Sequence, residues 1–122
     1  MKLIKCVHAY AAILELSNKD MDCKSAYALM KLERQLKDHV EFFLKEERKL
    51  AEQYAKKEDG KPVFTDTGFV YEDPSKREEY NEKHKELENL DVDFRKFGSL
   101  KLDSMTPRQM DALDGFIKIE VE

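Results

Sequence analysis

A heptad repeat of apolar residues within residues 22–59 constrains this chain more than any other feature. One row of the repeat places a large apolar residue at every seventh position: Leu29, Leu36, Phe43 and Leu50. A second row, three residues earlier, holds Ala26, Glu33, Val40, Glu47 and Tyr54. This spacing predicts one long amphipathic helix over residues 22–59, whose narrow apolar seam packs against other helices.

Two glutamates interrupt the second row of the seam. Glu33 and Glu47 either lie at its edge, where they reach solvent or a partner's lysine or arginine, or set the register inside an oligomeric core. The spacing alone leaves both interpretations open. We expect the seam to take its neighbours from its own chain first and from another chain second.

A shorter amphipathic helix is predicted over residues 1–17. Its apolar stripe is formed by Leu3, Val7, Tyr10 and Leu14. The polar link over residues 17–20 is so short that it turns the chain straight back. The first helix should therefore lie antiparallel against the start of the long helix.

The long helix is expected to end at Asp59, because Gly60 suits a C-terminal cap and Pro62 cannot continue a helix. Residues 62–72 then hold two β-rich runs on either side of an Asp-Thr-Gly turn, which predicts a β-hairpin or an extended flap. A third helix is predicted over residues 74–90, with an aspartate cap and a proline at its first position.

Residues 91–122 are predicted to form short strands around a short helix. Apolar and polar residues alternate over 92–95 and 99–103, which indicates two strands or one broken strand, and they alternate again over 117–121. A Thr-Pro-Arg-Gln capping box at 106–109 opens the helix between them.

The predicted fold class is therefore mainly α with minor β (α+β). It is an antiparallel helical hairpin built on one long helix, with a short β-hairpin and C-terminal strand–helix–strand elements. A chain of 122 residues is most simply one domain, residues 1–122.

Composition and charge narrow the classes of partner. The 22 basic and 26 acidic residues nearly cancel, and no run of lysine and arginine marks a nucleic-acid surface. Cys6 and Cys23 are too few for a disulfide framework and fit a reducing compartment. Charge interrupts the apolar residues at the N-terminus, so neither a signal peptide nor a membrane span is expected. We expect a soluble cytoplasmic protein that binds neither nucleic acid nor membrane.

No catalytic, cofactor-binding or metal-binding residue is predicted. His8, His39 and His84 lack the helical spacing of metal ligands, the two cysteines form no CxxC pair, and the glycines are isolated. His84 lies on the apolar stripe of the third helix and is interpreted as an interfacial histidine. The chain is therefore expected not to be an enzyme.

The candidate interaction surface combines the seam with the aromatic residues near the predicted hairpin. It comprises Leu29, Leu36, Phe43, Leu50, Tyr54, Phe64, Phe69 and Tyr71. Aromatic residues at an exposed tip are favoured binding anchors. The alternative interpretation is that the aromatic residues form a local small core.

Several stretches resemble a family of small uncharacterised proteins from tailed phages and prophages of Gram-positive bacteria. They are residues 9–14, 24–29, 46–54, 58–61, 86–94, Leu100 and 106–113. The aromatic insert over 63–71 departs from the short linker of that family. The resemblance implies a phage origin and a role in virion morphogenesis or another accessory task, and it transfers no active-site residue.

Two functions follow as expectations. The first is a non-enzymatic phage or prophage accessory protein that acts through protein–protein interaction, with itself as an oligomer and with other phage proteins, in the host cytoplasm or on the virion. The alternative is a prefoldin-like chaperone or clamp whose hairpin presents aromatic side chains to clients.

Overall fold

The computed structural model describes residues 1–66, 68–95, 98–101 and 104–120. Its helices are α1 (Leu3–Leu16), α2 (Cys23–Tyr54), the short 3-10 helix η1 (Pro74–Lys76), α3 (Arg77–Glu88) and α4 (Pro107–Leu113). Its strands are β1 (Lys57–Glu58), β2 (Lys61–Pro62), β3 (Phe64–Thr65), β4 (Gly68–Phe69), β5 (Ser99–Lys101) and β6 (Lys118–Glu120). The predicted α+β class, mainly helical and built on one long helix, is confirmed.

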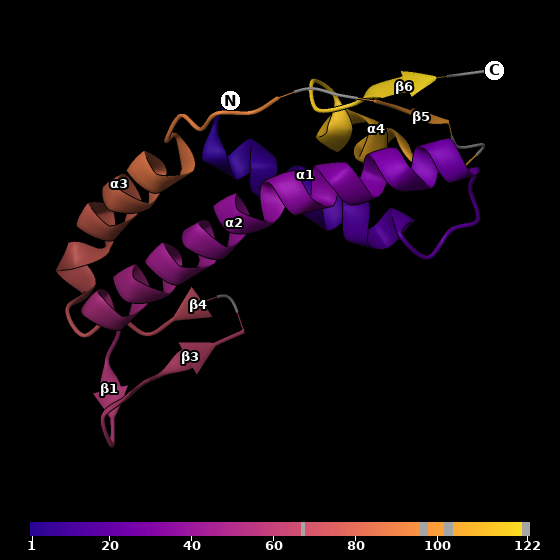
Figure 1. Cartoon of the computed structure of the whole chain (residues 1–122). Coiled ribbons are helices and arrows are strands. Elements are labelled where there is room, and N and C mark those ends of the chain that lie inside the picture. The colour runs from indigo at the N-terminus through magenta and orange to yellow at the C-terminus, as the bar shows by residue number, and fades with distance from the viewer. Residues whose placement is uncertain (67, 96–97, 102–103, 121–122) are drawn as a thin grey trace.

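Helix α2 is the spine on which the other elements pack (Figure 1). Helix α1 covers its N-terminal half and α3 lies beside its C-terminal half, while β5 packs on α2 and pairs with β6, and α4 packs on α1. The small strands β1 to β4 lie at the end of the molecule where α2 ends. Because α1 and α3 pack on different halves of one helix, the apolar interior divides into two parts.

The larger part, here called the main core, joins α1, the first half of α2 and the C-terminal elements. Its buried residues include Cys6, Ala9, Ile13, Leu29, Leu32, Leu36, Leu100, Leu113, Phe116 and Ile117. The smaller part, here called the small core, consists of Leu3, Phe43 and Leu87, one residue from each of α1, α2 and α3. The heptad seam of α2 thus runs from one core into the other.

The predicted apolar stripe of α1 is rotated from the face that is buried. Leu14 is exposed and Val7 and Tyr10 are only partly covered, whereas Cys6 and Ala9 are fully buried. Almost every position of α1 is apolar, so the pattern could not distinguish the faces. The small residues face inward, where they allow α1 to approach its neighbours closely.

Helix α2 ends at Tyr54, five residues before the predicted end at Asp59, and the prediction there was wrong. Asp59 and Gly60 have φ angles of 51° and 76° and connect β1 to β2 as an antiparallel hairpin. Asp-Gly is a favoured pair for such a two-residue turn. The pair therefore forms a hairpin turn and not a helix cap.

The predicted hairpin over residues 62–72 is present, within the described residues, as the antiparallel pair β3 and β4. It is joined to the chain that leaves α2, since Val63 N donates to Lys56 O at 2.9 Å and Val70 N donates to Val63 O at 3.0 Å. Glu72 N then donates to Tyr54 O at 3.0 Å. The chain after α2 is therefore a small antiparallel meander that returns to the end of the helix.

The caps of the later helices follow the prediction. Asp73 Oδ1 accepts hydrogen bonds from the Ser75 backbone N–H at 3.0 Å and the Ser75 hydroxyl at 2.7 Å. The Thr106 hydroxyl accepts from Gln109 N at 3.2 Å, and Gln109 Oε1 accepts from Thr106 N at 3.0 Å. Both local motifs thus satisfy backbone donors that a helix start leaves without partners.

The run predicted as a strand over 92–95 forms no strand, although Val92 N donates a hydrogen bond to Met1 O at 2.9 Å. Gln35 of α2 holds it through two hydrogen bonds, from Arg95 N at 2.7 Å and to Arg95 O at 2.9 Å. The second run is a strand, because β5 pairs in parallel with β6. Residues 102–103 and 121, which belonged to the predicted strands, lie outside the described residues.

Candidate functional site

The seam residues of the predicted interaction surface are mostly interior. Leu29 and Leu36 lie in the main core and Phe43 in the small core, where it is 3% exposed, while Leu50 is half-buried beside the small core. The seam therefore takes its neighbours from its own chain. This corrects the prediction that these residues form an association surface, since a buried side chain offers a partner no contact area.

The aromatic residues near the hairpin gather around Tyr80 of α3. The centroid of the Tyr80 ring lies 5.8 Å from that of Tyr54, 5.0 Å from that of Phe69 and 5.9 Å from that of Tyr71. All three contacts are edge-to-face, the geometry that aromatic quadrupoles favour. These four rings pack together as a local aromatic cluster, as the alternative interpretation expected. The cluster is distinct from the small core of Leu3, Phe43 and Leu87. It leaves Phe64, which is 63% exposed, as an aromatic side chain turned to solvent.

Glu47 meets a partner from its own chain. Its Oε2 atom lies 2.8 Å from His84 Nε2, and Glu88 Oε1 lies 2.9 Å from His84 Nδ1. Glu33, the other glutamate of the seam, is half-exposed. The prediction that His84 is interfacial is confirmed, and one of the two glutamates that interrupt the seam is the residue that binds it.

A groove between α2 and α3 was not foreseen from the sequence. It has a volume of about 330 Å³ and is lined by Phe42, Leu50, Leu87 and Leu90, with Glu46, Lys83 and Glu86 around it. Phe42 is 47% exposed and Leu90 is 44% exposed. One signal was available, because Phe42 is a large apolar residue outside the seam on an otherwise charged face.

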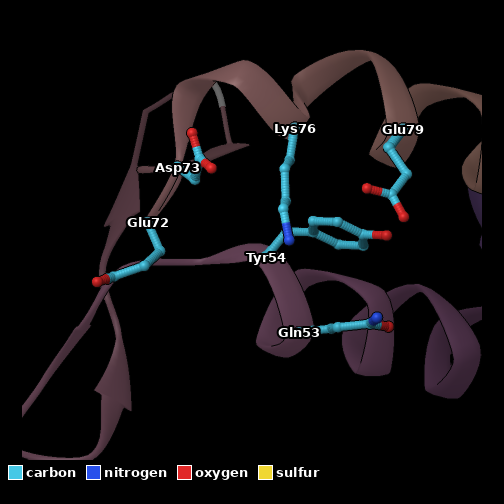
Figure 2. Close-up of a pocket in the computed structure, with 6 residues that line it drawn as sticks. All are labelled: Gln53, Tyr54, Glu72, Asp73, Lys76 and Glu79. Carbon is cyan, nitrogen blue, oxygen red and sulfur yellow. The ribbon is translucent and has the colours of Figure 1, made fainter.

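A second depression lies between the end of α2 and the start of α3. It has a volume of about 280 Å³ and is lined by Gln53, Tyr54, Glu72, Asp73, Lys76 and Glu79. Figure 2 shows the side chains of Lys76 and Glu79 extending from the η1–α3 segment toward the Tyr54 ring on α2.

One acidic residue of this depression, Asp73, has a structural role. Asp73 is committed to capping η1, and hydrogen bonds from the Ser75 hydroxyl and then the Ser75 backbone N–H hold the pKa of Asp73 below its usual value. Lys76 lies among the carboxylates as a countercharge.

Within the described ranges, no three His, Cys, Asp or Glu side chains come together as a metal site would require. None of the described helices has the length and apolar character needed to cross a membrane. Comparison of the chain with protein-family models, with curated proteins and with solved structures finds no significant match.

Proposed function

We propose that this protein works through protein–protein interaction and that the groove between α2 and α3 is its contact surface. The observation that supports the proposal is the exposure of Phe42 and Leu90 beside a concave apolar surface. Exposed apolar groups around a groove are typical of binding sites for other proteins. In this proposal the contact surface is the groove between α2 and α3, which is exposed, and not the heptad seam, which is buried.

The proposed occupant is a second copy of the chain. Phe42 itself lines the groove, so a two-fold axis through this surface would set the Phe42 side chain of each copy against the groove of the other. The rim of the groove carries both positive and negative side chains, and Lys83 and Glu86 lie on the same helix. Such a surface is complementary to itself, since a two-fold pairing can set the lysine of one copy against the glutamate of the other.

A phage or prophage setting, with a role in morphogenesis or another accessory task, remains part of the proposal through the resemblance described above. Portal, capsid or tail genes beside this gene would support it, and their absence would count against it. A prefoldin-like clamp is less well supported, because among the described aromatic residues of the hairpin only Phe64 is largely exposed.

Phe42→Asp is expected to raise the apparent dimer dissociation constant at least about 30-fold, the effect of losing a central contact worth about 2 kcal/mol. A buried carboxylate without a partner opposes association. The measurement is sedimentation velocity over a series of protein concentrations. Circular dichroism of the variant establishes that the fold is kept, as expected for an exposed position.

Leu44→Asp is the matched control. Leu44 is 52% exposed, lies on the same helix and is rotated about 200° from Phe42, so it faces away from the groove. Its replacement should leave the dissociation constant unchanged. A wild-type protein that stays monomeric at high concentration, or an equal loss of association in both variants, would contradict the proposal.

A further inference from the structure

The hydrogen bonds of His84 determine its protonation state. Each ring nitrogen lies within 2.9 Å of a carboxylate oxygen, Nε2 at 2.8 Å from Glu47 and Nδ1 at 2.9 Å from Glu88. An ionised carboxylate can only accept a hydrogen bond, so both ring nitrogens must donate. Only the imidazolium form carries a proton on both nitrogens. The neutral ring would set a lone pair against a carboxylate oxygen.

The two hydrogen bonds differ in what they join. Glu88 lies one turn after His84 on α3, whereas Glu47 lies on α2, so the bond to Glu47 crosses between the helices. The ring is held from both sides, by Phe43 edge-to-face at 5.9 Å and by Tyr80 stacked at 5.7 Å. The side chain of His84 is 22% exposed. The proton that completes the crossing bond is thus largely shielded.

Other groups near the His84 ring matter if they change protonation in the same pH range. The small core, to which Phe43 beside the ring belongs, includes Leu3 of α1, and Ile4 and Val7 of α1 pack against it. From α3, Tyr80 faces the ring, and Tyr71 packs against Tyr80 at 5.9 Å. Burial first, and then the charge of Glu47, raise the pKa of Tyr80 above its usual value. Tyr80 therefore stays a neutral phenol through the range in which histidine titrates.

We propose that His84 is a proton-operated latch that holds α3 on α2. As the imidazolium it binds Glu47 across the helix interface. When Nε2 loses its proton to solvent as the pH rises, that bond is lost and α3 loosens together with the meander that packs on Tyr80. Since α3 supplies Leu87 to the groove and the segment directly after α3 supplies Leu90, loosening would also remove one wall of the dimer site. Only this last consequence rests on the proposed function.

The direction of the pH dependence follows from the environment of the ring. Burial alone would lower the pKa of His84, but the hydrogen bonds that the ring donates to Glu47 and then to Glu88, together with the charges of these carboxylates, outweigh it and raise the pKa above 6.5. A raised pKa in the folded state means that the stabilisation is complete below pH 6.5 and is lost as the pH rises through the folded value. The latch should therefore open as the pH rises through this raised pKa, above the ordinary value of 6.5.

The test combines NMR and hydrogen exchange on the full chain between pH 5.5 and 9, at a concentration where it is monomeric. The His84 ring should titrate above pH 6.5. Amide exchange of α3, corrected for its intrinsic pH dependence, should accelerate over the same range by about tenfold for each unit by which the pKa of His84 exceeds its value in the open form. Amides in the middle of α1, which is held by the main core, should not follow.

Two variants make the result specific. Glu47→Gln should lower the pKa of the His84 ring and flatten the change in α3 exchange. His8→Gln, at an exposed position of α1, should leave both unchanged. A His84 ring that titrates at or below pH 6.5, or α3 exchange that is indifferent to its titration, would overturn the latch. Because these readouts use the monomer, they stand or fall separately from dimer formation.

Discussion

Replacing Phe43 with alanine is expected to lower the free energy of unfolding by about 3–5 kcal/mol, the range for removing a buried phenylalanine. Phe43 packs with Leu3 of α1 and Leu87 of α3 and is 3% exposed, so a single side chain joins three helices. The truncation leaves a cavity bounded by three helices. Because these helices are also held by other contacts, they cannot all move inward to fill it, and the cavity adds to the cost. Urea unfolding followed by circular dichroism measures the loss.

Phe42→Ala provides the comparison for this prediction. The two phenylalanines are adjacent, yet Phe42 is 47% exposed. Its truncation should cost less than about 1 kcal/mol at a concentration where the protein is monomeric, as is usual for surface positions. Equal costs at the two positions would mean that α3 does not pack on α2 through the small core.

Gly98→Ala is expected to destabilise the fold by about 2–5 kcal/mol through two effects that add. Gly98 has a φ angle of 76°, a conformation that costs a residue with a side chain about 1–2 kcal/mol. A β-carbon at this position would also lie 2.9 Å from the β-carbon of Ala28. Relieving that clash moves β5 away from α2, an overpacking cost of about 1–3 kcal/mol. Thermal and urea unfolding both report the sum.

Gly60→Ala separates the two effects. Gly60 has the same φ angle of 76°, but no atom lies within 4 Å of the β-carbon that alanine would add. Its replacement should therefore show the conformational cost alone. The difference between the two variants measures how closely β5 approaches α2. If Gly98→Ala costs no more than Gly60→Ala, the close approach of β5 to Ala28 is not needed for the fold.

The parts of the fold that follow from local rules could be predicted. The heptad row of Leu29, Leu36 and Phe43 is buried along α2, because a regular apolar spacing has one solution on a helix. The caps at Asp73 and Thr106 depend on neighbours within three residues. These features need no knowledge of what lies across the interface.

The remaining features depend on contacts between distant residues. The sequence could not indicate that Glu47 would meet His84, since that pairing requires the register of α3 against α2. The buried face of α1 was ambiguous because its apolar residues extend over most of the helix surface and leave only Lys5, His8 and Glu15 as polar positions. The groove at Phe42 could not be foreseen for a similar reason. Phe42 lies outside the seam of α2, and the groove forms because α3 packs beside Phe42 without covering it.

The contribution of β5, α4 and β6 to the main core has a consequence for synthesis on the ribosome. Helices α1 and α2 leave the ribosome first. The apolar faces that they contribute to the main core remain exposed to solvent until Leu100, Leu113, Phe116 and Ile117 have been translated and can cover them. Until then the nascent chain exposes Leu32 and Leu36, which attract chaperones or other nascent chains. Codon changes that slow translation after residue 60 should therefore increase aggregation, although every helix of the first half has already been made.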